Sequence, residues 1–197
     1  MHISEGVLSA PVLIAGAVLS SGGLALGLRR IKSEDIPKVA MLSSAFFVAS
    51  LIHIPIGPSS AHLVLNGLVG ILLGWPAFPS IFVGLVLQAL LFQFGGLTTL
   101  GVNTFAMAMP AVLAHYTFKK MIQRSRNIAF IGGFFGGAFA VIIGTLFVSI
   151  ALVETEKSFT AVAGTLLAMH IPIALIEGVI TGFVVVYLKR VKPEVLG

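Results

Sequence analysis

The sequence of 197 residues has no cysteine, and charged residues make up only 10% of it. Without cysteine there are no disulfides and no thiolate metal ligands, so any transition-metal site must use nitrogen or oxygen donors. A soluble domain carries about 25% charged residues. Hydrophobic residues make up 57% of this chain. So few charges cannot cover a surface that faces water, and the composition therefore predicts a protein whose solvent is lipid.

The apolar runs are long and do not alternate with polar residues, which favours membrane helices over the strands of a barrel. About 20 apolar residues cross a bilayer as a helix. We predict an all-α integral membrane protein, with residues 1–197 as a single transmembrane domain and a short N-terminal segment at 1–7. The seven predicted helices cover residues 8–28, 39–56, 61–75, 79–95, 99–118, 128–153 and 163–188. The third is short, which indicates either a tilted helix or a re-entrant helix packed inside the protein.

The basic residues predict the orientation of this seven-helix bundle. Eleven of the twelve lysines and arginines lie in the segments 29–38, 119–127 and 189–192. With the N-terminus outside, all three segments fall on the cytoplasmic side, together with the C-terminus. The charge of +5 therefore reflects membrane topology, and we expect no nucleic-acid partner. The predicted location is the cell membrane (the inner or plasma membrane), crossed several times.

His2 has an unusual chemical position. The first apolar run has no basic residues before it, so we do not expect a cleaved signal peptide. Initiator methionine removal generally requires a small second residue, so we expect Met1 to stay. The Met1 amine, the His2 backbone nitrogen and His2 Nδ1 can then bind one metal through a five-membered and a six-membered chelate ring. One further imidazole completes a square plane, a geometry that suits Ni(II) and Cu(II) and is open to Co(II).

Other polar residues mark candidate sites within or near the predicted spans. His62 follows an outer loop, and His53 and His170 lie toward the same side, so each is a candidate ligand or a packing histidine with a hydrogen-bonded neighbour. Three further candidates lie inside the helices: Gln88, Asn103 and Glu177. They either orient a metal ligand or join helices by hydrogen bonds. Glu177 is the most costly of these to bury, and it requires a hydrogen-bond partner, a cation or a proton.

The chain lacks the signatures of an enzyme. It has no Walker A motif for ATP and no HExxH motif, and no nucleophile lies beside a base in a convincing arrangement. We therefore expect a transport protein that is not an enzyme. A stand-alone secondary transporter or channel for metal ions is an alternative, and it requires a continuous polar path. A purely structural subunit is another alternative, but it leaves the outer histidines without an explanation.

Five segments resemble the CbiM/NikM family, the substrate-binding membrane subunits of cobalt and nickel energy-coupling-factor (ECF) ABC transporters. They are residues 1–8 (MHISEGVL), 59–62 (SSAH), 88–92 (QALLF), 95–105 (GGLTTLGVNTF) and 177–182 (EGVITG). The resemblance implies a seven-helix bundle whose N-terminus inserts from outside. It also implies Co²⁺ or Ni²⁺ as transported substrate, held by the Met1 amine, both His2 nitrogens and His62, with Asn103 in support.

The same resemblance implies partners for the chain. These are a transmembrane coupling subunit, ATP-binding cassette subunits that hydrolyse ATP, and a small accessory membrane subunit. Because the sequence carries no fused C-terminal extension, we expect the accessory subunit to be a separate protein. The run Phe92-Gln93-Phe94-Gly95-Gly96 has no charge, whereas relatives often place a charged residue there.

Overall fold

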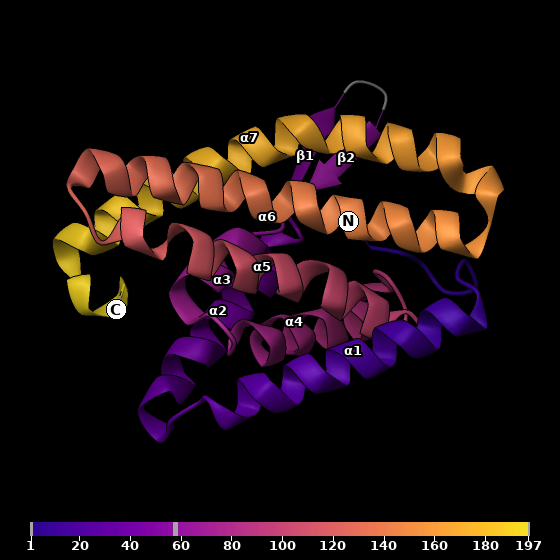
Figure 1. Ribbon diagram of the computed structural model, residues 1–197, viewed down its shortest axis with the longest axis horizontal. Helices are drawn as coiled ribbons and strands as arrows, with labels where there is room; N and C mark the ends of the chain where they lie inside the picture. The colour runs from indigo at the N-terminus through magenta and orange to yellow at the C-terminus, as the bar shows by residue number, and fades with distance from the viewer. Residues whose placement is uncertain (1, 57–58, 197) are drawn as a thin grey trace.

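A computed structural model describes residues 2–56 and 59–196, with only the backbone described for residues 53–56 and 59–61. Helices dominate these residues (Figure 1). The α-helices are α1 (Ala10–Arg29), α2 (Ile36–Ala49), α3 (Asn66–Leu73), α4 (Ala77–Phe92), α5 (Leu100–Ile122), α6 (Arg126–Thr155) and α7 (Thr160–Val191). Short 3₁₀ turns are found at Ser33–Asp35, Lys157–Phe159 and Pro193–Leu196, and strands β1 (His53–Ile56) and β2 (Ser59–His62) form a hairpin.

Within the part of the chain that the structure describes, three helical segments are long and apolar enough to cross a membrane. They are Ala10–Arg29, Arg126–Thr155 and Lys157–Val191. In Figure 1, α6 and α7 lie side by side along the long axis of the molecule, and α1 runs along its opposite edge. The chain is therefore a helical membrane protein, with α5 packed between α1 and α6.

The segment between α2 and α3 differs from the sequence prediction. Helices were expected over 39–56 and 61–75, but α2 ends at Ala49, and α3 begins only at Asn66. The antiparallel hairpin of β1 and β2 lies between them, with His53 paired to His62 and Pro55 to Ser60. Proline has no N–H for a helix and is tolerated in a strand at a sheet edge. In a two-stranded sheet both strands are edges, so Pro55 fits the hairpin and not a helix.

Helix α3 is short and buried on all sides. Its eight residues cover about 12 Å, well below the roughly 30 Å of bilayer hydrocarbon. Residues Asn66 to Leu72 are all buried, so this helix packs inside the protein. Such packing was part of the second of the two expectations for the third segment. Leu65, which precedes it, has a φ of 55°. This left-handed backbone is unusual for a leucine.

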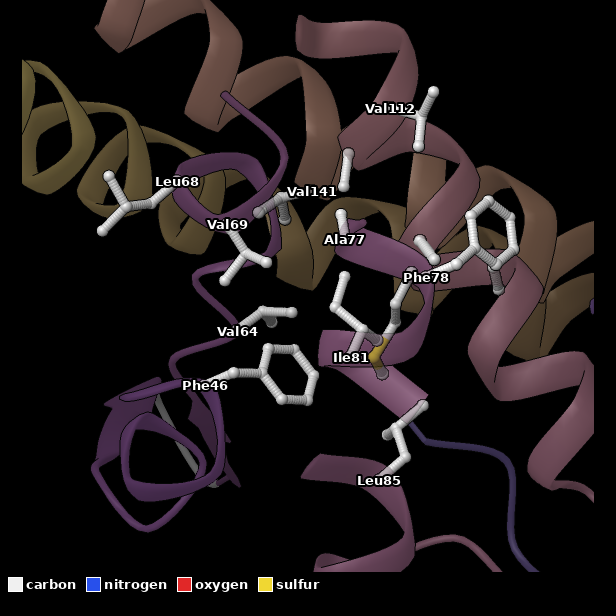
Figure 2. Packing of buried hydrophobic residues seen from close by; sticks show 14 of the residues in the cluster. Phe46, Val64, Leu68, Val69, Ala77, Phe78, Ile81, Leu85, Val112 and Val141 are labelled. Carbon is white, nitrogen blue, oxygen red and sulfur yellow. The ribbon is translucent and has the colours of Figure 1, made fainter. Parts of the chain in front are cut away.

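The apolar core lies where the short helices meet the long ones (Figure 2). Phe46 of α2 and Phe78 and Ile81 of α4 are fully or almost fully buried there, beside Val69 of α3 and Val141 of α6. Burying a large apolar side chain contributes about 1.5–3 kcal/mol against water. Part of this core is shielded from lipid as well as water, so close packing, rather than the hydrophobic effect alone, holds it together.

Glycines bring α6 and α7 into close contact. A Cβ on Gly133 would lie 2.9 Å from the Cα of Gly182, and one on Gly137 would lie 2.8 Å from the carbonyl oxygen of Glu177. No larger residue fits at these two positions without separating the helices. This contact fixes Glu177 against α6 and directs its side chain to the short helix and its preceding loop.

Candidate metal centre

Two histidines that are 60 positions apart in the sequence face one another. His2 Nδ1 lies 3.1 Å from His62 Nε2. The ring centroids are 4.8 Å apart with an interplanar angle of 35°. His2 reaches this point on the N-terminal segment ahead of α1, and His62 lies at the end of β2. The structure thus brings together the two side chains that the sequence identified as candidate ligands.

Each of the two rings also has a hydrogen-bond partner on the side that faces away from the other ring. His2 Nε2 lies 2.6 Å from Gln88 Oε1, and in the tautomer that donates from Nε2 to this acceptor the other nitrogen, Nδ1, keeps its lone pair. His62 Nδ1 lies 2.8 Å from the carbonyl oxygen of Leu63, which places the proton on Nδ1. In these tautomers the nitrogens that face each other both present lone pairs. Such a pair is favourable only with a cation between the two nitrogens.

Burial keeps His2 in its neutral form. Removal from water lowers the pKa of the His2 imidazole well below its usual value, and the neighbouring His62 lowers it further. The hydrogen bond to Gln88 acts in the opposite direction but does not offset burial. A metal ligand must be the unprotonated ring. His2 is therefore ready to bind a metal without first losing a proton from its side chain.

Asn103 and Thr99 hold the main chain of Ile3, the residue next to His2. Asn103 Oδ1 accepts the Ile3 N–H at 3.0 Å, and its Nδ2 donates to the Ile3 carbonyl at 3.0 Å. Thr99 Oγ1 donates to the same carbonyl at 2.9 Å. Both residues lie at the start of α5, and Ile3 is only 4% exposed. Together they fix the backbone on which His2 is carried.

The turn at residues 95–98 contacts the N-terminal segment through hydrogen bonds from Thr98 to Glu5. Gly95 has a φ of 79°, and a Cβ there would lie 3.0 Å from Asn103 Nδ2. The Thr98 N–H donates to Glu5 Oε1 at 3.1 Å, and the Thr98 hydroxyl also donates to this carboxylate. These hydrogen bonds lower the pKa of Glu5. Sequence reasoning gave no role to Thr99, Gly95 or Glu5. The polar residues in the turn before α5 were the available signal.

Glu177 of α7 holds the loop that carries His62. Its carboxylate accepts the backbone N–H of Val64 through Oε1 and that of Leu65 at 3.0 and 2.9 Å through both oxygens. The side chain is fully buried. The partners that the sequence could not identify for Glu177 are therefore two backbone amides. These two amides follow the candidate ligand His62 by two and three residues. Their hydrogen bonds to Glu177 hold Leu65 in its left-handed conformation.

The structure describes the side chain of one further histidine candidate. His170 is buried in α7, where its Nδ1 lies 2.8 Å from the Leu166 carbonyl one turn earlier. No hydrogen bond recorded for the described residues joins it to His2 or His62. Met1 lies outside the described residues, as does the side chain of His53. Among the described side chains, no three from His, Cys, Asp and Glu gather at one point. Two imidazoles alone leave a transition metal undercoordinated.

These features define a class, a helical membrane protein in which two imidazoles from distant segments face each other as candidate metal ligands. Comparison with known proteins identifies the family. A family model described as "Cobalt uptake substrate-specific transmembrane region" (CbiM) matches residues 2–195. A protein of Haemophilus influenzae that is named as a metal transport protein is 43% identical over 100% of this chain and 97% of its own length. A crystal structure titled as a transition metal transporter has a TM-score of 0.72 at 26% identity, covering 97% of this chain and 93% of its own.

Two further relatives carry more specific names. The cobalt transport protein CbiM of Lachnoclostridium phytofermentans is 32% identical, with 96% of this chain and 82% of its own length covered. A protein of Archaeoglobus fulgidus that is named as a fused nickel transport protein, NikMN, is 32% identical over 100% of this chain and 68% of its own length. The chain belongs to the CbiM family. It is thus a substrate-specific membrane component of metal uptake, as the sequence motifs indicated.

Proposed function

We propose that the chain captures Co²⁺ or Ni²⁺ outside the cell with four nitrogen donors. These are the Met1 amine, the His2 backbone nitrogen, His2 Nδ1 and His62 Nε2. The first three form two fused chelate rings, and His62 closes the plane opposite the His2 amide. Tetragonal nitrogen coordination suits nickel and is open to cobalt, and it suits zinc poorly. The names of the relatives, which include both cobalt and nickel, support this pair of substrates.

The observation that supports the proposal best is the 3.1 Å distance between His2 Nδ1 and His62 Nε2. Two nitrogens that bind one metal at about 2.1 Å and at right angles lie about 3 Å apart. A metal requires the tautomers in which His2 donates from Nε2 to Gln88 and His62 donates from Nδ1 to the Leu63 carbonyl, and both acceptors lie within hydrogen-bond distance of these nitrogens.

We further propose that the chain crosses the membrane seven times, with the centre toward the outside. The last turns of α1, α5 and α7 carry Arg29, Lys119 with Lys120, and Lys189 with Arg190. Cytoplasmic ends of membrane helices favour such residues. In this arrangement α3 and the extended residues before it complete one crossing inside the protein, where lipid does not reach the irregular backbone.

The energy for import comes, in this proposal, from partner proteins of an energy-coupling-factor transporter. A coupling subunit, ATP-binding cassette subunits and a small accessory membrane subunit complete the assembly. The absence of a Walker A motif from this sequence supports a division of labour in which the chain binds metal and its partners hydrolyse ATP. Release inside then requires reprotonation of the His2 amide or a change in its geometry.

The test of the centre is a Gly-Ser-Gly-Ser extension placed ahead of Met1, with the same extension at the C-terminus as control. The N-terminal extension keeps every side chain and moves the free amine away from His2. Nickel affinity, measured by calorimetry on the purified full chain, is expected to fall more than about 100-fold, beyond the 10–100-fold typical of outer-shell changes. The control is expected to bind as the unmodified protein does. Unchanged affinity in the N-terminally extended protein contradicts the chelate.

A second experiment tests the partnership. Proteoliposomes that contain the chain alone are compared with ones that contain it together with coupling and cassette subunits. Nickel uptake is expected only with the complete set and ATP, and it is expected to stop when the cassette subunits carry a substitution of their Walker A lysine. Uptake by the chain alone down a nickel gradient identifies a stand-alone transporter instead.

A further inference from the structure

A second polar hollow lies at the other end of the helices, far from the metal centre. Six residues around it carry the argument: Arg30, Asp35, Lys38, Trp75, His115 and Tyr116. They come from the end of α1, the turn before α2, α2 itself, the turn before α4, and α5. The cavity has a volume of about 180 Å³. One water takes up about 30 Å³ of liquid, so the cavity has room for a group of several atoms.

The charges around this cavity favour an anion. Arg30 and Lys38 are two cations from different helices, while Asp35 is the one carboxylate among the six. Asp35 also accepts the backbone N–H of Lys32 at 3.3 Å. Arginine keeps its charge at all physiological pH values and offers a planar fork that fits two oxygens of a phosphate.

Arg30 is held in position before any ligand arrives. Its Nη1 donates to the Tyr116 hydroxyl at 3.0 Å, and its guanidinium lies 5.6 Å from the centre of the Trp75 ring. Only one of its five N–H donors is used in the hydrogen bond to Tyr116. His115 uses Nδ1 for the Ile71 carbonyl at 2.8 Å, which leaves Nε2 as an acceptor. The cavity therefore offers donors for a phosphate and an acceptor for a neighbouring hydroxyl.

An apolar hollow adjoins the polar one. It has a volume of about 390 Å³ and lies along α2 and α4, where Leu28, Ile36, Ala40 and Val83 are among its lining residues. Val39 lines both hollows. A polar cavity with two cations, next to an apolar hollow with which it shares Val39, matches one kind of molecule, an amphipathic one with a phosphate head and a hydrocarbon tail.

We infer that these paired hollows bind a phospholipid, with its phosphodiester at Arg30 and Lys38 and one acyl chain between α2 and α4. A headgroup with hydroxyls, as in phosphatidylglycerol, places a donor near His115. The site does not depend on the metal centre, which draws on other residues. Its role is to hold the turn between α1 and α2 at the membrane surface, within the segment 29–38 that carries four of the basic residues of the chain.

The single tryptophan of the sequence, Trp75, lines the polar cavity and provides the readout. The full chain in detergent is titrated with phosphatidylglycerol or phosphatidylcholine, and Trp75 emission is followed. Phosphatidylglycerol is expected to bind at least tenfold more tightly. Native mass spectrometry counts the bound lipids as a second readout.

Variants separate the parts of the site. Arg30→Gln with Lys38→Gln is expected to weaken phosphatidylglycerol binding at least tenfold, and Arg30→Gln alone by a smaller factor. The matched control is Lys120→Gln with Arg124→Gln, which removes the same charge from the same end outside the two hollows, and its binding is expected to stay unchanged. Ala40→Phe fills the apolar hollow and is expected to weaken lipid binding without affecting the binding of inorganic phosphate. Nickel content equal to that of the wild type shows that each variant is folded.

Three results overturn the inference. One is undiminished phosphatidylglycerol binding in the folded Arg30 and Lys38 variants. Another is displacement of the lipid by inorganic phosphate at matched concentration, with no effect of Ala40→Phe, which identifies a site for the free anion. The third is loss of the coupling subunit from the purified complex of the double variant while lipid binding persists, which identifies a protein contact.

Discussion

The metal centre and the basic end of the molecule are both polar, yet they are organised in opposite ways. Asn103, which belongs to the centre, and Lys119, at the basic end, lie on the same helix about 24 Å apart along its axis. At the centre, Gln88 and Glu177 are completely buried and bonded to other protein groups. At the basic end, Arg30 is exposed and lines an open cavity.

This contrast follows from the solvent around each region. A buried polar group costs about 1–3 kcal/mol or more when it has no partner. At the centre most polar groups therefore bond one another, whereas Nε2 of the buried Gln88 amide has no hydrogen-bond partner among the described residues. At a membrane surface, water and headgroups provide partners, so side chains can stay available. The polar side chains of the centre are therefore held by protein contacts alone, whereas the exposed Arg30 at the basic end also reaches water and headgroups.

The largest difference in nickel affinity is expected between two variants that each lose one imidazole, one at the metal centre and one at the basic end. His62→Ala removes a ligand and is expected to lower nickel affinity more than about 100-fold, beyond the range of outer-shell changes. His115→Ala also removes an imidazole that is bonded to a backbone carbonyl, but this one lies at the basic end. The nickel affinity of this variant is expected to stay within about twofold of wild type. Calorimetry with both purified variants gives the comparison. Equal losses would show that the two regions are coupled.

Nickel affinity at the metal centre is expected to fall as the pH is lowered. Because burial lowers the pKa of His2, its ring stays neutral as pH falls through 6.5, and its protonation does not limit binding between pH 8 and 6. The His2 amide proton, and the proton of the Met1 amine below its pKa of about 7.7–8.0, must still leave. Affinity is expected to fall at least tenfold per pH unit from the amide proton alone, or at least about 100-fold from pH 8 to 6. Calorimetry across this range is the measurement. A flat profile contradicts amide ligation.

Gln88→Met tests the hydrogen bond that fixes the His2 tautomer. Without the acceptor, His2 Nε2 loses the group that holds its proton, and nickel affinity is expected to drop about 10–100-fold. The nickel absorption spectrum should change as well, because the imidazole can rotate. Gln123→Met at the basic end is the control, and its affinity and spectrum are expected to match wild type. An unaltered spectrum and affinity for Gln88→Met would leave the residue with a packing role only.

Glu177→Gln is expected to have the smallest effect of the series. The glutamine amide keeps one acceptor oxygen for the Val64 and Leu65 N–H groups. Its NH₂ group replaces the second acceptor oxygen of the carboxylate. The loss of about 1 kcal/mol of hydrogen bonding predicts a decrease in nickel affinity of about fivefold, because His62 is held less firmly. Glu154→Gln, at an exposed position of α6, is the control. Hydrogen exchange of residues 63–66 should rise in the Glu177 variant only.

The sequence was sufficient for the long helices and insufficient for the short ones. The helices α1, α6 and α7 each contain a long apolar run, so hydropathy alone places them. The segment 50–65 is also apolar, but Pro55 and Pro58 interrupt its hydrogen-bonding pattern. That local signal was available for the hairpin. The left-handed Leu65 before α3 was not predictable, because a carboxylate from α7 stabilises it.

For the site, residue type identified the candidates but not their partners. Position 2 made His2 a chelating residue on chemical grounds, and polar residues in apolar helices marked Gln88, Asn103 and Glu177. Whether each bonds a ligand or joins two helices depends on contacts between distant segments. The resemblance to known motifs supplied the order of these segments. The structure supplied the contacts, which include the hold of Asn103 on Ile3 and of Gln88 on His2.

The bond from Glu177 to Val64 joins residues 113 positions apart. Membrane proteins are synthesised and inserted from the N-terminus onward. His2 and His62 therefore emerge early, but the loop behind His62 has no anchor until the last helix is in place. The completed metal centre is thus the final product of insertion. A chain halted before α7 enters the bilayer would hold both histidines and lack the fixed geometry to capture an ion, so only finished molecules compete for scarce metal.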